Sequence, residues 1–133
     1  NLETIRRLHK TLRPEANYLL SLSVLKKLKA LNPDLTTKSS LILGLGETEK
    51  EVAQTLQDLR ENYCDILTLG QYLAPSTFHY PIKEFIAIGQ FARYKEIGLG
   101  LGFKTVLSGP LVRSSYQAET IYKELACSAL STK

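Results

Sequence analysis

The chain has 133 residues, of which 44% are hydrophobic and 23% charged, and its formal net charge is +4. This length suits one domain, and the balance of apolar and charged residues is ordinary for a globular protein, which excludes disorder of the whole chain. No apolar run approaches the roughly 18 residues of a membrane span, and the start does not resemble a secretory signal. We therefore expect a cytoplasmic protein without a membrane partner.

The cysteines and the basic clusters give little functional information by themselves. Cys64 and Cys127 lie too far apart for a metal knuckle and form no disulfide framework, so we expect two reduced thiols. Basic residues gather within 6–13 and 26–29, a pattern typical of solvated helix faces that can also attract acidic partners. No aromatic residues are interleaved with them, so nucleic-acid binding is not indicated.

Hydrophobic periodicity predicts the first half of the fold. Leucines recur at helical spacing over 17–31, and Asn32-Pro33 ends that helix. A continuous apolar run over 39–44 predicts a strand buried on both faces. Thr48 and Glu51 have the spacing of a capping box, which predicts a helix from 48 to about 62 with an apolar stripe.

The second half continues the alternation. The run 65–73, which ends at turn residues 74–76, predicts a second strand. Aromatic and aliphatic side chains at helical spacing predict a helix over 88–101, and glycines weaken its last turn. Residues 104–109 predict a third strand, and 116–130 predict a closing helix whose inward side carries Ile121, Leu125 and Ala129.

Helices that alternate with strands indicate the α/β class, with parallel strands and crossover helices. About half of a (β/α) barrel or a small doubly wound sheet would both fit. We see no internal repeat or linker, so 1–133 is taken as a single segment.

Three polar loops follow the three predicted strands: GLGE (44–47), GQYLAPS (70–76) and SGPLVRSS (108–115). The carboxyl ends of parallel strands meet at one edge, where ligands bind in α/β sheets and barrels. The loops therefore predict a site at that edge without naming its chemistry.

Each loop also has a structural interpretation. GLGE can be a tight turn, because glycine permits positive φ, and Gln71-Tyr72 can simply end a strand. Ser114-Ser115 precede a helix, where serine is a common N-cap, and Arg113 can pair with a carboxylate. These alternatives stay open on local grounds.

The histidines do not indicate a catalytic or metal site. His9 and His79 are isolated in the sequence. Nothing local resembles a Ser-His-Asp or Cys-His nucleophile set, and no cluster has the spacing of zinc ligands.

Five stretches together resemble a known family: NLET (1–4), RPEANY (13–18), TKSSLILGLGET (37–48), DILTLGQYLAPS (65–76) and SGPLVRSSYQAE (108–119). In this order they resemble the carboxyl-terminal half of the lipoyl synthases. These radical S-adenosylmethionine enzymes insert two sulfur atoms at C6 and C8 of a protein-bound octanoyl chain. The resemblance implies the second half of a partial (β/α)6 TIM-type barrel with a closing helix.

The resemblance also implies S-adenosylmethionine and two [4Fe-4S] clusters, one of them a sacrificial sulfur source. The family holds these clusters with a CxxxCxxC motif and a separate cysteine triad, and neither motif occurs here. Cys64 and Cys127 lie outside every matching motif. Because the chain starts at Asn1 and has no methionine, we expect a fragment that is inactive alone and exposes strand edges to its missing half.

Five positions are implied to bind the cofactor. Asn1 and Glu3 match residues that contact the ribose hydroxyls, a task that suits amide and carboxylate oxygens. Ile42 matches the aliphatic residue that packs against adenine, and Gln71 and Tyr72 belong to the matching GQYLAPS loop.

Ser115 matches the serine that ligates one iron of the auxiliary cluster. A hard oxygen is the ligand most readily displaced from iron that otherwise prefers thiolates. Arg113 is implied as an electrostatic neighbour of the cluster or substrate. The chain departs from the family at Ser40, usually glycine, and at Gln117, usually histidine.

The implied partners are octanoylated acceptor domains of 2-oxoacid dehydrogenases or the glycine cleavage H protein, and an electron donor such as ferredoxin or flavodoxin. A weaker hypothesis is that Lys26 and Lys29 dock an acidic lipoyl-accepting domain. In a eukaryote, a mitochondrial or plastid location is implied.

Two other functions stay open. The amides of GLGE and the helix start at Ser114-Ser115 would cradle phosphate in an unrelated barrel enzyme. Alternatively, the chain is a non-catalytic binding module that has lost the clusters.

Overall fold

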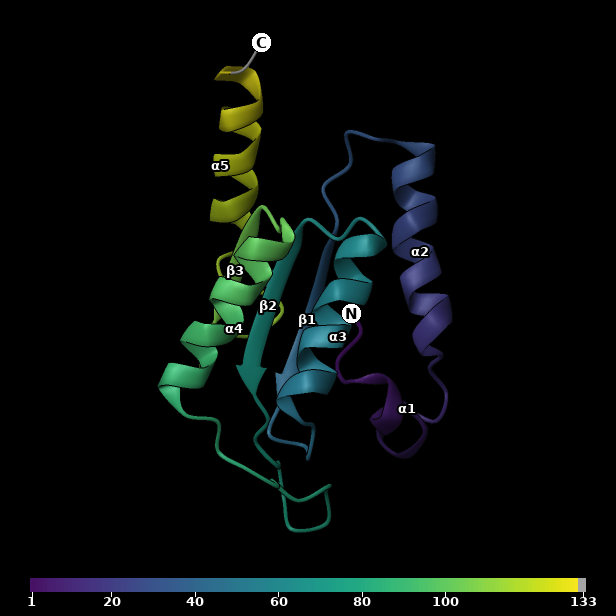
Figure 1. Ribbon diagram of the computed structural model, residues 1–133, viewed down its shortest axis with the longest axis vertical. Coiled ribbons are helices and arrows are strands. Elements are labelled where there is room, and N and C mark those ends of the chain that lie inside the picture. Colours follow the sequence, from purple (N-terminus) through teal and green to yellow (C-terminus); the bar gives the residue numbers. More distant parts are fainter. Residues whose placement is uncertain (132–133) are drawn as a thin grey trace.

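The computed structural model describes residues 1–131, apart from the side chain of Ala129 (Figure 1). The elements are α1 (Arg6–Leu12), α2 (Tyr18–Leu31), β1 (Lys38–Leu43), α3 (Glu49–Glu61), β2 (Ile66–Gln71), α4 (Ile88–Leu101), β3 (Thr105–Ser108) and α5 (Ala118–Ser131). All seven predicted elements are present within a few residues, and α1 is an additional helix. In the described part of the chain, no helix is long and apolar enough to cross a membrane.

The three strands form a parallel sheet in the order β1-β2-β3. Ser40 pairs with Thr68, which in turn pairs with Leu107. Glu3 extends the sheet beyond β1, because its N–H donates to the Ser40 carbonyl and its own carbonyl accepts from Ile42, both at 2.8 Å. The α/β class with parallel strands is confirmed, and the (β/α)6 barrel stays a prediction.

Helices α3 and α4 cover one face of the sheet (Figure 1). Val52, Leu56 and Leu59 of α3 are fully buried against this face, as the predicted stripe requires. The capping box is also confirmed, since the Glu51 N–H donates to Thr48 Oγ1 and the Thr48 N–H donates to the Glu51 carboxylate. Local sequence therefore determines both where α3 begins and which side it buries.

Helix α2 begins at an asparagine cap and buries only part of its leucine repeat. Asn17 Oδ1 accepts from the Leu20 N–H at 3.0 Å. Leu22 and Leu25 are buried. The other leucines of the repeat, Leu19 and Leu28, are 56% and 38% exposed, so the periodicity identifies the helix without identifying its buried side.

Helix α1 was not predicted, because little in its sequence favours a helix. It has only seven residues, and Ile5 at its N-cap makes no side-chain capping bond. Its stability comes from tertiary contacts: Leu8 and His9 are buried, and Arg7 Nε lies 2.6 Å from Glu51 Oε1 of α3. The Arg7 hydrogen bond is also the main reason why the pKa of Glu51 falls to about 2.

The closing helix α5 extends past the amino ends of the strands (Figure 1). Ile121 is buried and Leu125 is half-buried, so these two residues face inward as predicted. The predicted inward position of Ala129 lies outside the described residues.

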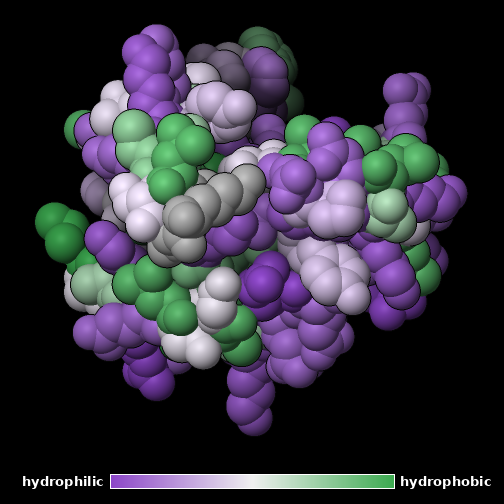
Figure 2. All heavy atoms as spheres, turned by 90° about the horizontal axis from the view of Figure 1, so that it is seen from above, coloured by the Kyte–Doolittle hydropathy of each residue, from purple (hydrophilic) through white to green (hydrophobic). Residues whose placement is uncertain are grey.

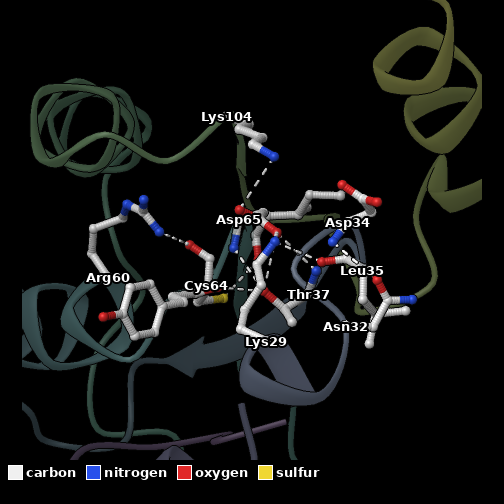
Figure 3. A network of polar contacts seen from close by, with 11 residues as sticks. Lys29, Asn32, Asp34, Leu35, Thr37, Arg60, Cys64, Asp65 and Lys104 are labelled. Atoms are coloured by element: carbon white, nitrogen blue, oxygen red, sulfur yellow. Dashed lines mark hydrogen bonds and ion pairs between the residues drawn. The ribbon is translucent and has the colours of Figure 1, made fainter. Parts of the chain in front are cut away.

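A buried carboxylate joins the beginnings of the strands (Figure 3). Asp65 precedes β2 and is 3% exposed. Its Oδ2 accepts from the Thr37 N–H at 3.0 Å and lies 2.7 Å from Lys29 Nζ, while its Oδ1 lies 3.5 Å from Lys104 Nζ. Burial opposes ionisation, but the bonds from Lys29 and Thr37 and the charge of Lys104 outweigh it and lower the pKa of Asp65.

Asp65→Asn should therefore lower the free energy of unfolding by about 3 kcal/mol at pH 7, because it leaves Lys29 without its anion. The folded-state pKa lies below the usual 3.8, so the stabilisation is complete above pH ~4 and disappears as the pH falls through the folded-state pKa. Urea unfolding at pH 7 and at successively lower pH should show the gap between the two proteins narrowing. Asp34→Asn, at an exposed position, is the control and should change stability by less than about 0.5 kcal/mol; an equal effect of both substitutions would contradict the role of Asp65.

Candidate functional site

A cavity of about 280 Å³ lies at the carboxyl edge of β1. Its walls include Glu3, Ile42 and Tyr72, three of the residues implied to bind the cofactor. They come from the segment beside β1, from β1 itself and from the residue after β2. Parallel pairing thus brings together side chains that are far apart in the sequence.

Glu3 is held in an unusual backbone conformation. Its φ is +68°, a left-handed value that few residues other than glycine adopt. The neighbouring residues fix it: the Leu2 N–H donates to Ser39 Oγ at 3.0 Å, and Arg13 Nη1 donates to the Asn1 carbonyl at 3.0 Å. Strain of this kind persists only where surrounding contacts enforce it, and it is frequent at functional sites.

Asn1 does not reach the same cavity. It lines a smaller hollow of about 180 Å³ beside α2. In a regular strand, side chains two residues apart share a side, but the left-handed φ of Glu3 interrupts that alternation. The ribose contact of Asn1 therefore stays a prediction that this cavity does not support.

Tyr72 connects β2 to the loop that closes the cavity. Its N–H donates to the Leu43 carbonyl at 2.7 Å, and its hydroxyl donates to the Tyr80 carbonyl at 2.8 Å. The Tyr80 hydroxyl reaches the Leu45 carbonyl at 3.3 Å. Both rings line the cavity and hold its wall against β1.

Thr4 lines the cavity as well, although its position in the sequence did not indicate it. Its side chain is buried, it lines the cavity, and its Oγ1 has no hydrogen-bond partner among the described residues. An unpaired buried hydroxyl destabilises a folded protein by about 1–3 kcal/mol. Thr4 lies within the NLET stretch, but only the structure shows that its hydroxyl is unpaired.

Gln71 has a structural role. Its Nε2 donates to the carbonyls of Tyr72 and Glu84, both at 3.0 Å, and its Oε1 accepts from the Ile86 N–H at 2.9 Å. Both amide hydrogens are used, and Gln71 is not among the cavity's lining residues. A cofactor contact for Gln71 stays a prediction without support from this cavity.

The GLGE loop binds its own carboxylate. Glu47 accepts from the Gly44 N–H at 2.6 Å and from the Leu45 N–H at 3.0 Å. Gly44 has a φ of +97°, and a Cβ there would lie 2.4 Å from Gln71 Nε2, so only glycine fits. Because Glu47 occupies two of the amides, the phosphate-cradle alternative for this loop is not favoured.

The SGPLVRSS loop leaves the carboxyl edge after a few residues. The Gly109 N–H donates to the Leu69 carbonyl, but the next residues cross the face of the sheet at Gly70, where a Cβ would lie 2.1 Å from the Val112 carbonyl oxygen. The Lys38 ammonium then binds the Ser114 carbonyl. Lys38 begins β1, so the expectation that this whole loop stays at the carboxyl edge is wrong.

Ser114 and Ser115 are exposed and do not directly precede a helix. Helix α5 begins at Ala118, so Gln117 occupies the position before it. The N-cap interpretation of the two serines is therefore wrong. Arg113 Nη1 donates to the carbonyls of Pro110 and Val112, which shapes the turn that carries Ser115.

Sequence comparison decides the family. No protein-family model matches the chain. It is 54% identical over 119 residues to the lipoyl synthase of Caldanaerobacter subterraneus subsp. tengcongensis, which covers 90% of this chain and 42% of the relative. The lipoyl synthase of Rubrobacter xylanophilus is 47% identical over 133 residues, 100% of this chain and 41% of the relative. In sequence, this chain is a relative of the lipoyl synthases.

The chain spans about two fifths of the length of the bacterial lipoyl synthases that it matches. The apicoplast lipoyl synthase of Plasmodium yoelii yoelii is 54% identical over 119 residues, 89% of this chain but 24% of that longer protein. The resemblance seen in the five motifs is thus confirmed as homology over nearly the whole chain.

The cysteines of this lipoyl synthase relative are not grouped. The described residues contain no cluster of three or more His, Cys, Asp or Glu side chains that could hold a metal ion. Cys64 is fully buried, and burial together with the nearby Asp65 charge raises its pKa to about 12. Both thiols are free, as predicted, and Cys64 is a core residue.

Gly70→Ala tests the path of the loop across the sheet. The added methyl group would collide with the Val112 carbonyl, so we expect a loss of about 1–3 kcal/mol in unfolding free energy and faster amide exchange over residues 110–116. The matched control is Gly100→Ala in α4, where a Cβ meets nothing within 4 Å and should stabilise the helix by up to about 1 kcal/mol. Unchanged exchange over 110–116 in the Gly70 variant would show that the loop lies elsewhere.

Proposed function

We propose that this chain is the part of a lipoyl synthase that contacts S-adenosylmethionine and supplies the serine ligand of the auxiliary cluster. The whole enzyme would insert two sulfur atoms at C6 and C8 of a protein-bound octanoyl-lysine. One observation carries the proposal: Glu3, Ile42 and Tyr72, chosen from the family resemblance, line a single cavity. Identities near 50% to lipoyl synthases support the same function.

The chemistry of the cavity fits an adenosine moiety. The Glu3 carboxylate accepts hydrogen bonds, as vicinal ribose hydroxyls require, and Ile42 offers an apolar surface to a base. The unpaired Thr4 hydroxyl supplies a further donor or acceptor. At about 280 Å³ the cavity is slightly smaller than the roughly 300–1,000 Å³ of ligand pockets, so these residues would contact part of the cofactor.

In the proposed enzyme, these residues would position S-adenosylmethionine and shield it from water. Carbons C6 and C8 of an octanoyl chain carry unactivated C–H bonds, which side-chain acids and bases do not break at useful rates. Bound S-adenosylmethionine supplies the radical chemistry. Glu3 and Thr4 would fix the ribose, while Tyr72 and Tyr80 would keep water from the cavity wall.

Ser115 is proposed as the oxygen ligand of the auxiliary [4Fe-4S] cluster. Its exposed position on the turn after Arg113 leaves the hydroxyl accessible to an iron atom. The described residues do not form a complete cluster site, so the remaining ligands would come from elsewhere in the protein. The two hydrogen bonds of Arg113 to the loop carbonyls would hold the turn in shape.

The acceptor domains, the electron donor and the organellar location belong to the same proposal. The structure corrects one detail of the docking hypothesis. Lys29 is 15% exposed and is engaged by Asp65 and by the Leu35 carbonyl, at 2.7 and 2.6 Å, so it is not available to a partner. Lys26 is exposed.

Thr4→Val tests the cofactor cavity. The substitution removes the unpaired hydroxyl while keeping its shape, so the chain should unfold at an equal or higher urea concentration. The affinity of the full-length enzyme for S-adenosylmethionine, measured by calorimetry, should fall about 5- to 15-fold through the lost hydrogen bond. Thr4→Ser is the control and should stay within about threefold of the original affinity; unchanged binding by Thr4→Val would remove Thr4 from the site.

Ser115→Ala tests the cluster ligand in the full-length enzyme. We expect at least 100-fold less lipoyl product, while the protein still folds and cleaves S-adenosylmethionine. Ser114→Ala, one residue away and also exposed, should keep its activity. Product formation by Ser115→Ala at the unmutated rate, with unchanged iron content, would contradict the assignment.

A further inference from the structure

A second pocket lies at the opposite end of the strands from the cofactor cavity. It has a volume of about 570 Å³ and lies between the end of α2, the end of α3 and the residues that precede β2 and β3. Its charged lining consists of Lys26, Lys29, Arg60, Lys104 and Asp65. Four cations therefore surround one carboxylate.

The carboxylate is already satisfied by its closest neighbours. Asp65 binds Lys29 at 2.7 Å and accepts two further bonds from Thr37 (Figure 3). Lys104 lies 3.5 Å away and its side chain is 53% exposed, so it can turn toward an external anion. Lys26 is also exposed, and the pocket thus presents more positive charge than Asp65 neutralises.

Apolar surface accompanies this charge. The lining includes Ala30, Pro33 and Tyr63, all exposed. Leu31, next to Ala30, is 84% exposed. Figure 2 looks onto this end of the molecule and shows hydrophobic and hydrophilic residues intermixed across it. Such a mixture is typical of a surface that binds another protein.

Tyr63 gives an independent indication. Its φ is +66°, at the end of α3, where glycine is the favoured residue. The Tyr63 N–H donates to the Arg60 carbonyl at 3.0 Å and its carbonyl accepts from Thr37 Oγ1 at 2.5 Å, so the backbone is fixed. Tyr63 is 49% exposed, so this position carries an aromatic residue against the local backbone preference and without full burial.

We propose that this pocket docks an acidic segment of a protein partner, with carboxylates at Lys26 and Lys104 and an apolar side chain against Tyr63. An isolated phosphate would meet the charge but leave the apolar lining uncovered. Tyr63 is the one aromatic residue in the lining, whereas nucleic-acid grooves stack successive bases on several aromatic side chains, so the lining disfavours a nucleic acid. The inference deepens the docking part of the proposed function, in which Lys26 meets an acidic partner, and it is independent of the cavity at the other end of the sheet.

Fluorescence anisotropy with a labelled peptide of four glutamates and two leucines provides the test. Lys26→Glu should weaken binding at least fivefold, whereas Lys27→Glu, with the same charge change on the next residue, should weaken it less than twofold. Lys104→Gln should weaken it at least threefold, and Lys95→Gln on α4 less than twofold. If both variants of a pair lost the same amount of peptide affinity, the loss would reflect net charge alone, and the proposal would be overturned.

Tyr63→Gly separates docking from folding. Relief of the left-handed strain should leave the unfolding midpoint unchanged or raise it, while peptide binding falls at least threefold. Unchanged binding in this variant would remove Tyr63 from the site. Three further outcomes would overturn an acidic protein segment as the occupant. They are equal binding of a peptide with glutamine in place of glutamate, full competition by millimolar inorganic phosphate, and tighter binding of a single-stranded oligonucleotide.

Discussion

The buried carboxylate of Asp65 is the constraint on which the sheet depends. Its side chain binds Thr37 before β1 and Lys29 of α2, and its backbone carbonyl accepts from the Lys104 N–H at 2.8 Å, just before β3. One residue thereby fixes where all three strands start. A charge removed from water is costly unless it is paired and hydrogen-bonded. Here its partners come from three separate segments of the chain: the end of α2 and the residues directly before β1 and β3.

Because the three parallel strands are aligned at their amino ends, their carboxyl ends also meet at one edge of the sheet. The six residues of β1 span about 20 Å, so the Asp65 network and the cavity lined by Glu3, Ile42 and Tyr72 occupy opposite ends of the same sheet. At the carboxyl end, residues that line the cavity are left strained or unpaired, as Glu3 and Thr4 show. At the amino end, the central polar group is fully bonded. The well-bonded amino end of the sheet thus offsets the cost of the strained Glu3 and the unpaired Thr4 at its carboxyl end.

Features that depend on contacts between residues close in sequence were predictable, whereas those that depend on contacts between distant residues were not. The capping box of Thr48 and Glu51 acts within one turn, so the start and the buried stripe of α3 were predictable. Helix α1 depends on tertiary contacts, namely the burial of Leu8 and His9 and the bond from Arg7 to Glu51, 44 residues away, which no local pattern contains. The path of the loop before Ser115 depends on the missing side chain of Gly70, and the engagement of Lys29 depends on Asp65.

The carboxylate of Glu47 has a consequence for how this scaffold could change. It accepts hydrogen bonds from two successive backbone amides, of Gly44 and Leu45, which would otherwise be open to an external anion. A single side chain therefore separates a loop that only shapes its neighbours from one that could capture phosphate.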